Sequence, residues 1–264
     1  MLQNHSIYFN DVFPYLLIFT RILGALFTMP FFGEHFITHK VRILFALSIS
    51  AVIAPIVMAK MPQTPTEPYL FFFYVAGELF IGVFIGTIAK FIFSAINVAG
   101  TIIGFQSGLM NAMVFNPSEA SQSSLQATFL GLVAMVIIFT TDTHFLMLQE
   151  IIESYSAFSP GYVIKFNLLS HDMFEALARV ASISMALGVQ LSAPFIILSL
   201  LFFIGLGILN RLMPQMPVFF IAQPFQIFMS FVILLLVTAS TISVFMDKFQ
   251  DIISTVWETK AVGR

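Results

Sequence analysis

Two things are scarce in this 264-residue chain: cysteine, which is absent, and charge, which 9% of the residues carry. Without cysteine the chain forms no disulfide, thiolate zinc site, iron–sulfur cluster or thiol-based catalytic centre. Soluble globular domains contain about 25% charged residues, so this composition excludes an ordinary soluble domain. The formal net charge of −2, without any run of five like charges, also excludes electrostatic binding of nucleic acid.

What fills the chain instead is apolar: 59% of the residues are hydrophobic and 33 are phenylalanine. A membrane-spanning helix needs ~20 mostly apolar residues, whereas the strands of a membrane barrel alternate apolar and polar positions. The long runs here are apolar on all sides, which predicts an all-α, polytopic membrane protein. No Lys or Arg precedes the first run, so it is not predicted to be a cleaved signal peptide. The sequence contains about six such runs: Val12–Pro30, Val41–Ala59, Tyr69–Gly100, Leu125–Leu148, Phe174–Leu209 and Val218–Met246.

Some runs are longer than a bilayer requires. The run Phe174–Leu209 would form a helix of roughly 54 Å at ~1.5 Å per residue. Such helices either tilt and kink, with Pro194 and Pro224 as the bending points, or pack partly against proteins outside the lipid; we favour the second interpretation. The longest polar connection, Ser154–Asp172, is where the chain is predicted to divide.

The polar residues do not assemble a catalytic or metal site. His35 and His39 have the spacing of metal ligands on a helix, but Glu34 is the only further ligand nearby, which favours a solvated loop. Asp142 and His144 lack a partner for hydrolysis and are interpreted as a polar helix end. No phosphate-binding P-loop is present. The sequence therefore predicts no enzyme, no cofactor and no metal site.

A few charges lie inside or beside the apolar runs, where an unpaired charge is costly. Glu78 and Lys90 are twelve residues apart, roughly 18 Å along one helix, so their partners must lie on other helices or other chains. We favour structural pairing over transport chemistry, because a small-solute or ion carrier needs charges that converge on broken helices. The charges are Arg21, Glu78, Lys90 and Arg179, with Arg211 at the turn of the last helical pair.

Glycines recur at every fourth residue in and before the segment Gly100–Ser124. Gly100, Gly104 and Gly108 form overlapping small-xxx-small patterns, and Gly82 and Gly86 form another. This spacing allows the backbone of a second helix to approach closely. These glycines are therefore predicted to be sites of close helix packing.

The residues after these glycines have a different character. Met110, Met113 and Phe115 are soft and apolar, and Asn116-Pro117 starts a turn that leads into a serine-rich stretch. Thioethers and aromatic rings beside a glycine-rich backbone suit a deformable seal, because methionine repacks around irregular shapes. An ordinary helix pair joined by a polar loop fits the same residues equally well on physical grounds.

This segment also carries a family resemblance. Gly77–Gly100 (GELFIGVFIGTIAKFIFSAINVAG) and Gly104–Ser124 (GFQSGLMNAMVFNPSEASQSS) resemble the signature region of the FliR family. Members of this family are subunits of the flagellar type III export gate. The resemblance also allows the alternative that this chain is the equivalent subunit of a virulence injectisome. Supporting matches are Arg21–Gly24 (RILG), Pro30–Gly33 (PFFG) and the dipeptide Asn210-Arg211. The resemblance covers nearly the whole chain.

The resemblance implies an architecture and a role. Residues 1–170 would be similar to the P-type gate subunit and 171–264 to a Q-type helical hairpin with a C-terminal tail. One copy would complete an assembly of P-type and Q-type subunits in the bacterial inner membrane at the flagellar basal body, next to the B-type export switch protein and the A-type export component. The segment 104–124 would plug the channel through which unfolded proteins pass. The plug or gate residues would be Gly104, Phe105, Gln106, Gly108, Met110, Asn111, Met113, Phe115, Asn116 and Pro117.

Overall fold

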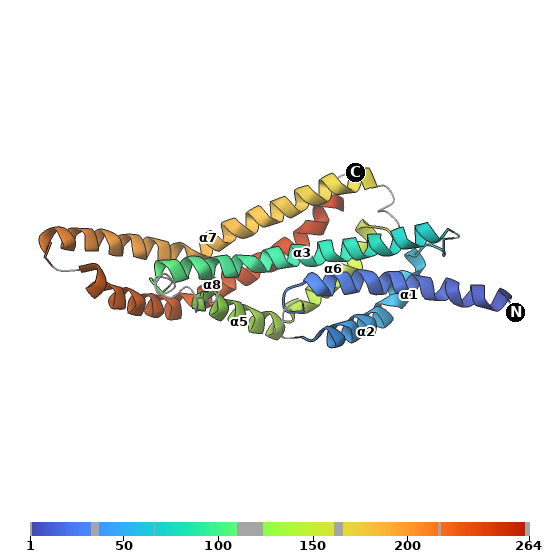
Figure 1. Cartoon of the computed structure of the whole chain (residues 1–264), viewed down its shortest axis with the longest axis horizontal. Helices are drawn as coiled ribbons and strands as arrows, with labels where there is room; N and C mark the ends of the chain where they lie inside the picture. Colours follow the sequence, from blue (N-terminus) through green and yellow to red (C-terminus); the bar gives the residue numbers. More distant parts are fainter. Residues whose placement is uncertain are drawn as a thin grey trace. The chain divides into compact units, whose positions relative to one another are not determined.

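The computed structural model describes residues 2–32, 37–65, 67–109, 124–160, 166–215 and 218–261. Within these ranges every regular element is a helix (Figure 1). This confirms the all-α prediction. In chain order the elements are α1 (Leu2–Thr28), α2 (His39–Val57), the short 3-10 helix η1 (Met58–Lys60), α3 (Pro68–Gln106), α5 (Leu125–Thr140), α6 (Thr143–Ala157), α7 (Phe166–Leu212) and α8 (Val218–Ala261).

Fewer helices qualify as membrane spans than the six apolar runs suggested. In the described residues four helices are long and apolar enough: His39–Lys60, Pro68–Gln106, Met173–Leu212 and Ile221–Ser254. Counting α5 and α6 together as one bent span gives five. The apolar part of α1, Val12–Thr28, is shorter than a span.

The prediction of one continuous run over Leu125–Leu148 is wrong. Helix α5 ends at Thr140, α6 begins at Thr143, and the two are bent by 74°. The break occurs at Asp142, whose φ of 57° places it in the left-handed region that a helix cannot continue through. Hydropathy averaged over a membrane span does not resolve the break, because the polar stretch Thr140–His144 is short and lies between two apolar helices.

The polar connection predicted at Ser154–Asp172 is shorter than expected, and helix also extends into the segment Gly100–Ser124. Helix α6 continues through Ser154 to Ala157, and α7 begins at Phe166, so only a few residues separate the two helices. Helix α3 likewise continues past Gly100 to Gln106. Polar side chains on these helices are buried against other helices, which stabilises helix where composition alone indicated loop.

The left-handed conformation of Asp142 gives a test of the bend. Asp and Asn tolerate this conformation and glycine favours it, whereas a β-branched side chain is strained there by about 1–2 kcal/mol. We expect Asp142→Val to lower the thermal unfolding temperature of the purified protein in detergent, and Asp142→Asn and Asp142→Gly to leave it nearly unchanged. Equal melting curves for all three variants would show that the bend does not depend on this conformation.

The chain folds into two compact units. Unit 1 contains Met1–Ile92, Asp142–Ala181 and Gln250–Arg264, and unit 2 contains Phe93–Thr141 and Ser182–Phe249. Both units therefore draw on helices far apart in the sequence, because α3, α7 and α8 each contribute residues to both.

In unit 1, α1 and α3 cross closely at glycines. A Cβ atom placed on Gly24 would lie 2.7 Å from the carbonyl oxygen of Leu79, and one on Gly82 would overlap the carbonyl oxygen of Arg21. A Cβ on Gly86 would overlap the hydroxyl of Thr28. Only glycine fits at these positions, so the Gly82-xxx-Gly86 spacing brings α3 against the backbone of α1 in the same chain. This crossing surrounds the buried charges of unit 1.

In unit 2, α3 packs against α5 and α7 in the same way. Toward α5, a Cβ on Gly100 would overlap the Cα of Ala127, and one on Gly104 would lie 2.8 Å from the Cβ of Ser124. Toward α7, a Cβ on Gly188 would lie 2.8 Å from the Cβ of Val98. Helices α7 and α8 form a hairpin, with the rings of Phe202 and Phe225 stacked 6.2 Å apart. The end of α3 is therefore held among three other helices.

Candidate functional site

Buried polar side chains gather at two places. One is a charged cluster around Arg21 in unit 1, and the other lies at the end of α3 in unit 2, on both sides of residues 110–123. Buried polar groups are costly unless they are hydrogen bonded, so each cluster identifies interactions that the fold has to satisfy.

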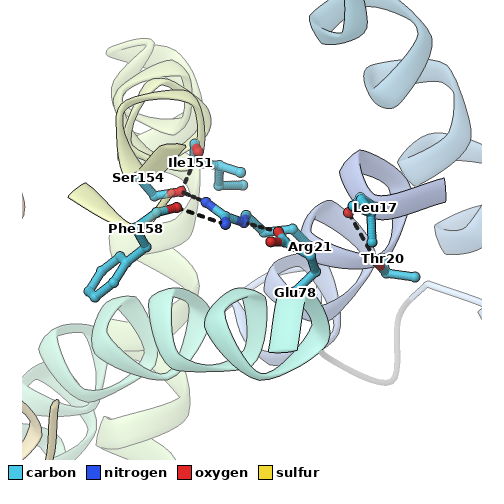
Figure 2. A network of polar contacts seen from close by, with 7 residues as sticks. All are labelled: Leu17, Thr20, Arg21, Glu78, Ile151, Ser154 and Phe158. Atoms are coloured by element: carbon cyan, nitrogen blue, oxygen red, sulfur yellow. Dashed lines mark hydrogen bonds and ion pairs between the residues drawn. The ribbon is translucent and has the colours of Figure 1, made fainter. Parts of the chain in front are cut away.

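The charged cluster is centred on Arg21 of α1, which is fully buried (Figure 2). Its Nε donates to Oε2 of Glu78 on α3 at 2.6 Å, and Glu78 is 1% exposed. One terminal nitrogen donates to the hydroxyl of Ser154 on α6 at 3.1 Å, and the other donates to the carbonyl oxygen of Phe158 at 3.0 Å. The guanidinium carbon lies 3.9 Å from the ring centre of Tyr155. Three helices of unit 1 therefore meet on one side chain.

This geometry indicates that the cluster holds helices of unit 1 together. The planar guanidinium suits such a node, because its donors form a rigid fork that a lysine ammonium does not have. The hydroxyl of Ser154 in turn donates to the carbonyl oxygen of Ile151 at 2.6 Å, which orients it as an acceptor for Arg21. Glu78 compensates the charge of Arg21, and each of the three guanidinium nitrogens already donates a hydrogen bond. Arg21 is therefore not available to bind a transported ion.

The second cluster joins the two chain ends that flank residues 110–123. Ser107 precedes this segment and Gln126 follows it, and the side-chain nitrogen of Gln126 donates to the hydroxyl of Ser107 at 3.2 Å. The hydroxyl of Ser124 donates to the carbonyl oxygen of Gly100 at 2.9 Å and accepts from the backbone N–H of Ala127 at 3.0 Å, which caps α5. The residues on either side of 110–123 therefore meet at one buried place, which we call the segment base.

Gln106 links the segment base to α7 and α8. Its side-chain oxygen accepts from the hydroxyl of Ser199 on α7 at 2.6 Å, and its backbone carbonyl accepts from the side chain of Gln226 on α8 at 2.8 Å. These three residues and Ser230 supply the polar lining of a small cavity that is otherwise apolar. The end of α3 is thus held by hydrogen bonds to the hairpin as well as by apolar packing.

The predicted plug residues fall into two groups. Phe105 is 61% exposed at the end of α3, while Gly108 is buried with a φ of 76°, a left-handed conformation that strains other residues. Gly104 packs on Ser124, and Gln106 makes the hydrogen bonds given above. Lying outside the described residues are Met110, Asn111, Met113, Phe115, Asn116 and Pro117.

The structure does not bring the remaining predicted charges together. Lys90 is exposed on α3. Arg179 pairs locally with Glu175, one helical turn earlier, at 3.2 Å, and both side chains are more than half exposed. Arg211 is exposed in the last turn of α7, where a positive charge complements the helix dipole.

Of the possible metal group, His39 is described, and its ring stacks on Phe27. The other two residues of the possible metal group, Glu34 and His35, lie outside the described residues.

Sequence reasoning misses the partners in both clusters. It assigns Ser154 to a polar connection, and it does not single out Ser107, Gln126, Ser199 or Gln226. The available signal is the occurrence of Ser and Gln side chains inside long apolar runs, where a polar group needs a nearby partner. That signal marks the residues but does not say which of them meet.

The close packing of Gly100 on α5 gives a second test. We expect Gly100→Ala to lower the free energy of unfolding by about 1–3 kcal/mol, because the added methyl group overlaps the α5 backbone. Gly131→Ala is the matched control, since a Cβ there meets only the side-chain oxygen of Asn97, at 3.4 Å. The measurement is thermal unfolding in detergent. Equal stability of the two variants would contradict the close approach of α3 and α5.

Comparison with known proteins places nearly the whole chain in one group. The family described as bacterial export proteins, family 1, matches residues 12–252. The chain is 30% identical over 243 residues to the flagellar biosynthetic protein FliR of Caulobacter vibrioides, covering 92% of this chain and 95% of that protein. It is 29% identical over 247 residues to FliR of Bacillus subtilis, covering 93% and 94%. It is 27% identical over 204 residues to FliR of Escherichia coli K12, covering 77% and 76%.

Proposed function

Because this chain belongs to the FliR family, whose members are subunits of the flagellar type III protein export gate, we propose that it closes the pore of that gate. The observation that carries the proposal is the segment base. Ser107 and Gln126 hydrogen bond across the segment, and Gln106 ties its start to α7 and α8. A plug has to be anchored on a rigid base while its tip yields to the passing polypeptide, and the segment base supplies such an anchor.

The residues between the two anchored ends suit a seal. Met110, Met113 and Phe115 are large, soft and apolar, so they can close around one another and repack around an unfolded chain. Apolar constrictions exclude ions because water leaves them. The plug proposal covers residues 104–124, with the described residues forming its base.

The length of the last two helices supports assembly with other proteins. Helix α7 has 47 residues, which is roughly 70 Å at ~1.5 Å per residue, whereas the hydrocarbon core of a bilayer is ~30 Å thick. In an apolar 18-residue stretch of this helix, only 22% of the residues are buried within the chain. Apolar surface beyond the hydrocarbon needs protein to cover it. We propose that P-type and Q-type gate subunits cover it, with residues 1–170 in a P-like and 171–264 in a Q-like position.

The wider setting follows from membership of the export apparatus. The chain is a membrane-embedded structural component of that apparatus, and we propose the bacterial inner membrane at the basal body as its location. The B-type switch protein and the A-type export component are its proposed neighbours. It performs no catalysis in this proposal, and the energy for export comes from other components. Its cargo is unfolded flagellar protein.

Isolation of the complex tests this proposal. The tagged protein is extracted from its native membrane in mild detergent and its assemblies are weighed by native mass spectrometry. We expect one copy of this chain together with several P-type and Q-type subunits. We expect Arg211→Ala, at the exposed end of α7, to weaken copurification with Q-type subunits while it leaves the Arg21 cluster and the segment base untouched. A stable lone monomer or a simple homodimer of the unmodified chain would contradict the proposal.

A further inference from the structure

One side of α3 changes from apolar to polar along its length. Each residue turns an α-helix by ~100°, so positions three and four apart return to the same side. On this side the N-terminal half of α3 exposes Tyr69, Phe72 and Leu79. From residue 87 onward the same side carries a set that we call the polar stripe: Thr87, Lys90, Ser94, Asn97 and Thr101.

The polar stripe lies opposite the isoleucine side of α3 and borders α5 at Asn97, whose side-chain oxygen lies next to Gly131. The buried positions recur with the same spacing but half a turn away, and each is at most 4% exposed. Lys90 and Asn97 are exposed, and the other three members of the stripe are half-buried. The stripe is therefore not a core surface within the chain. The buried positions are Ile81, Ile85, Ile88, Ile92 and Ile96.

The chemistry of the stripe is unsuited to lipid. In the described part of the chain Lys90 forms no ion pair, and the side-chain amide of Asn97 makes no hydrogen bond. Lys90 lies 22 residues after the start of α3 and 16 residues before its end, roughly 33 and 24 Å, so its ammonium reaches neither end of the helix. The hydroxyls of Thr87 and Thr101 bond their own helix at 2.7 and 2.8 Å, which leaves the ammonium and the amide to be solvated from outside.

We propose that the polar stripe lines the water-filled path along which exported polypeptide moves, up to the point where α3 ends at the segment base. This proposal rests on the proposed function. Water solvates Lys90 without a carboxylate partner, and a wall that presents the ammonium of Lys90 and the amide of Asn97 gives a moving backbone transient hydrogen bonds without a tight binding site. The apolar half of the same side, from Tyr69 to Leu79, faces lipid or protein.

Because the chain contains no cysteine, thiol labelling of the chain can be assigned to a cysteine that is introduced. Single variants Thr87→Cys, Lys90→Cys, Asn97→Cys and Thr101→Cys are made in the full-length chain within its native membrane. Intact spheroplasts and inverted vesicles, which together present both sides of the membrane, are treated with a negatively charged, membrane-impermeant methanethiosulfonate. The matched controls are Phe72→Cys and Leu79→Cys on the same side of α3, and Leu235→Cys on α8, where the native residue is 81% exposed.

We expect the stripe positions to react at least about tenfold faster than the controls, because a thiol in apolar surroundings retains its proton and is a poor nucleophile. We also expect labelling at Asn97→Cys to reduce export. Stripe positions that react as slowly as Phe72→Cys would overturn the proposal and indicate that a partner helix covers the stripe. Controls that react as fast as the stripe would overturn it too, because the stripe would then not differ from the rest of the helix.

Two measurements on the same membranes distinguish a failure of the stripe proposal from a failure of the proposed function. Copurification of P-type and Q-type subunits with the unmodified chain reports on the gate assignment alone. An intact gate with an unreactive stripe rejects only the stripe proposal. A chain that copurifies with neither subunit rejects the proposed function, whatever the labelling pattern.

Discussion

Replacing Arg21 with alanine is expected to lower the free energy of unfolding by about 3–5 kcal/mol, because it removes the ion pair that compensates the buried carboxylate of Glu78. The loss includes the hydrogen bonds to Ser154 and to the carbonyl of Phe158. The measurement is the fraction of protein that stays monodisperse in detergent after heating, read by size-exclusion chromatography. We also expect less of the variant to accumulate in membranes.

Two further variants make this result specific. Arg21→Met combined with Glu78→Leu removes both charges together, and we expect it to be more stable than either single variant, because no buried charge is left uncompensated. Arg179→Ala is the matched control. It removes an arginine from an exposed pair one helical turn apart, which contributes at most about 0.5 kcal/mol. A loss of stability in Arg179→Ala as large as that in Arg21→Ala would contradict the role of burial.

Changing Met110, Met113 and Phe115 together to alanine is expected to make the gate leak while the complex remains assembled. Smaller side chains cannot close the constriction, whereas the packing that holds the segment base involves other residues: Gly100, Gly104, Ser107, Ser124 and Gln126. Leakage is measured as single-channel current of the purified complex in planar bilayers and as growth sensitivity to small toxic solutes. Deletion of residues 111–116 should have the same effect.

The control for this prediction removes the same kinds of side chain elsewhere. Changing Met185, Met213 and Phe228 to alanine shortens three exposed residues of α7, α8 and their connection that make no hydrogen bond to the segment base; complexes of this variant that assemble should have unchanged conductance. A complex that assembles and stays tight without Met110, Met113 and Phe115 would reject the plug. Loss of the protein without any conductance would show that these residues are ordinary packing residues in a helical hairpin.

Local properties of the sequence were enough to determine the class of protein. The scarcity of charge and the long apolar runs required a helical membrane protein, because only helices satisfy every backbone group within a run that is apolar on all sides. The spacing of Gly82 and Gly86 indicated close packing, and Arg21 and Glu78 stood out as charges that need partners. The motif Gly104–Ser124 indicated the family. None of these inferences needs two distant residues to be placed together.

The tertiary structure decided which residues meet. Arg21 pairs with a residue 57 positions away and binds Ser154 at a separation of 133, and Gln106 meets Gln226 at a separation of 120. Hydropathy and helical periodicity describe one helix at a time, so they identify a buried polar residue without naming its partner. The sequence marked Asp142 and His144 as a polar helix end, but only the structure showed that the chain bends there through a left-handed residue and continues as a second helix. The segment base exists only because glycines let α3 approach α5 closely enough for Ser107 and Gln126 to bond.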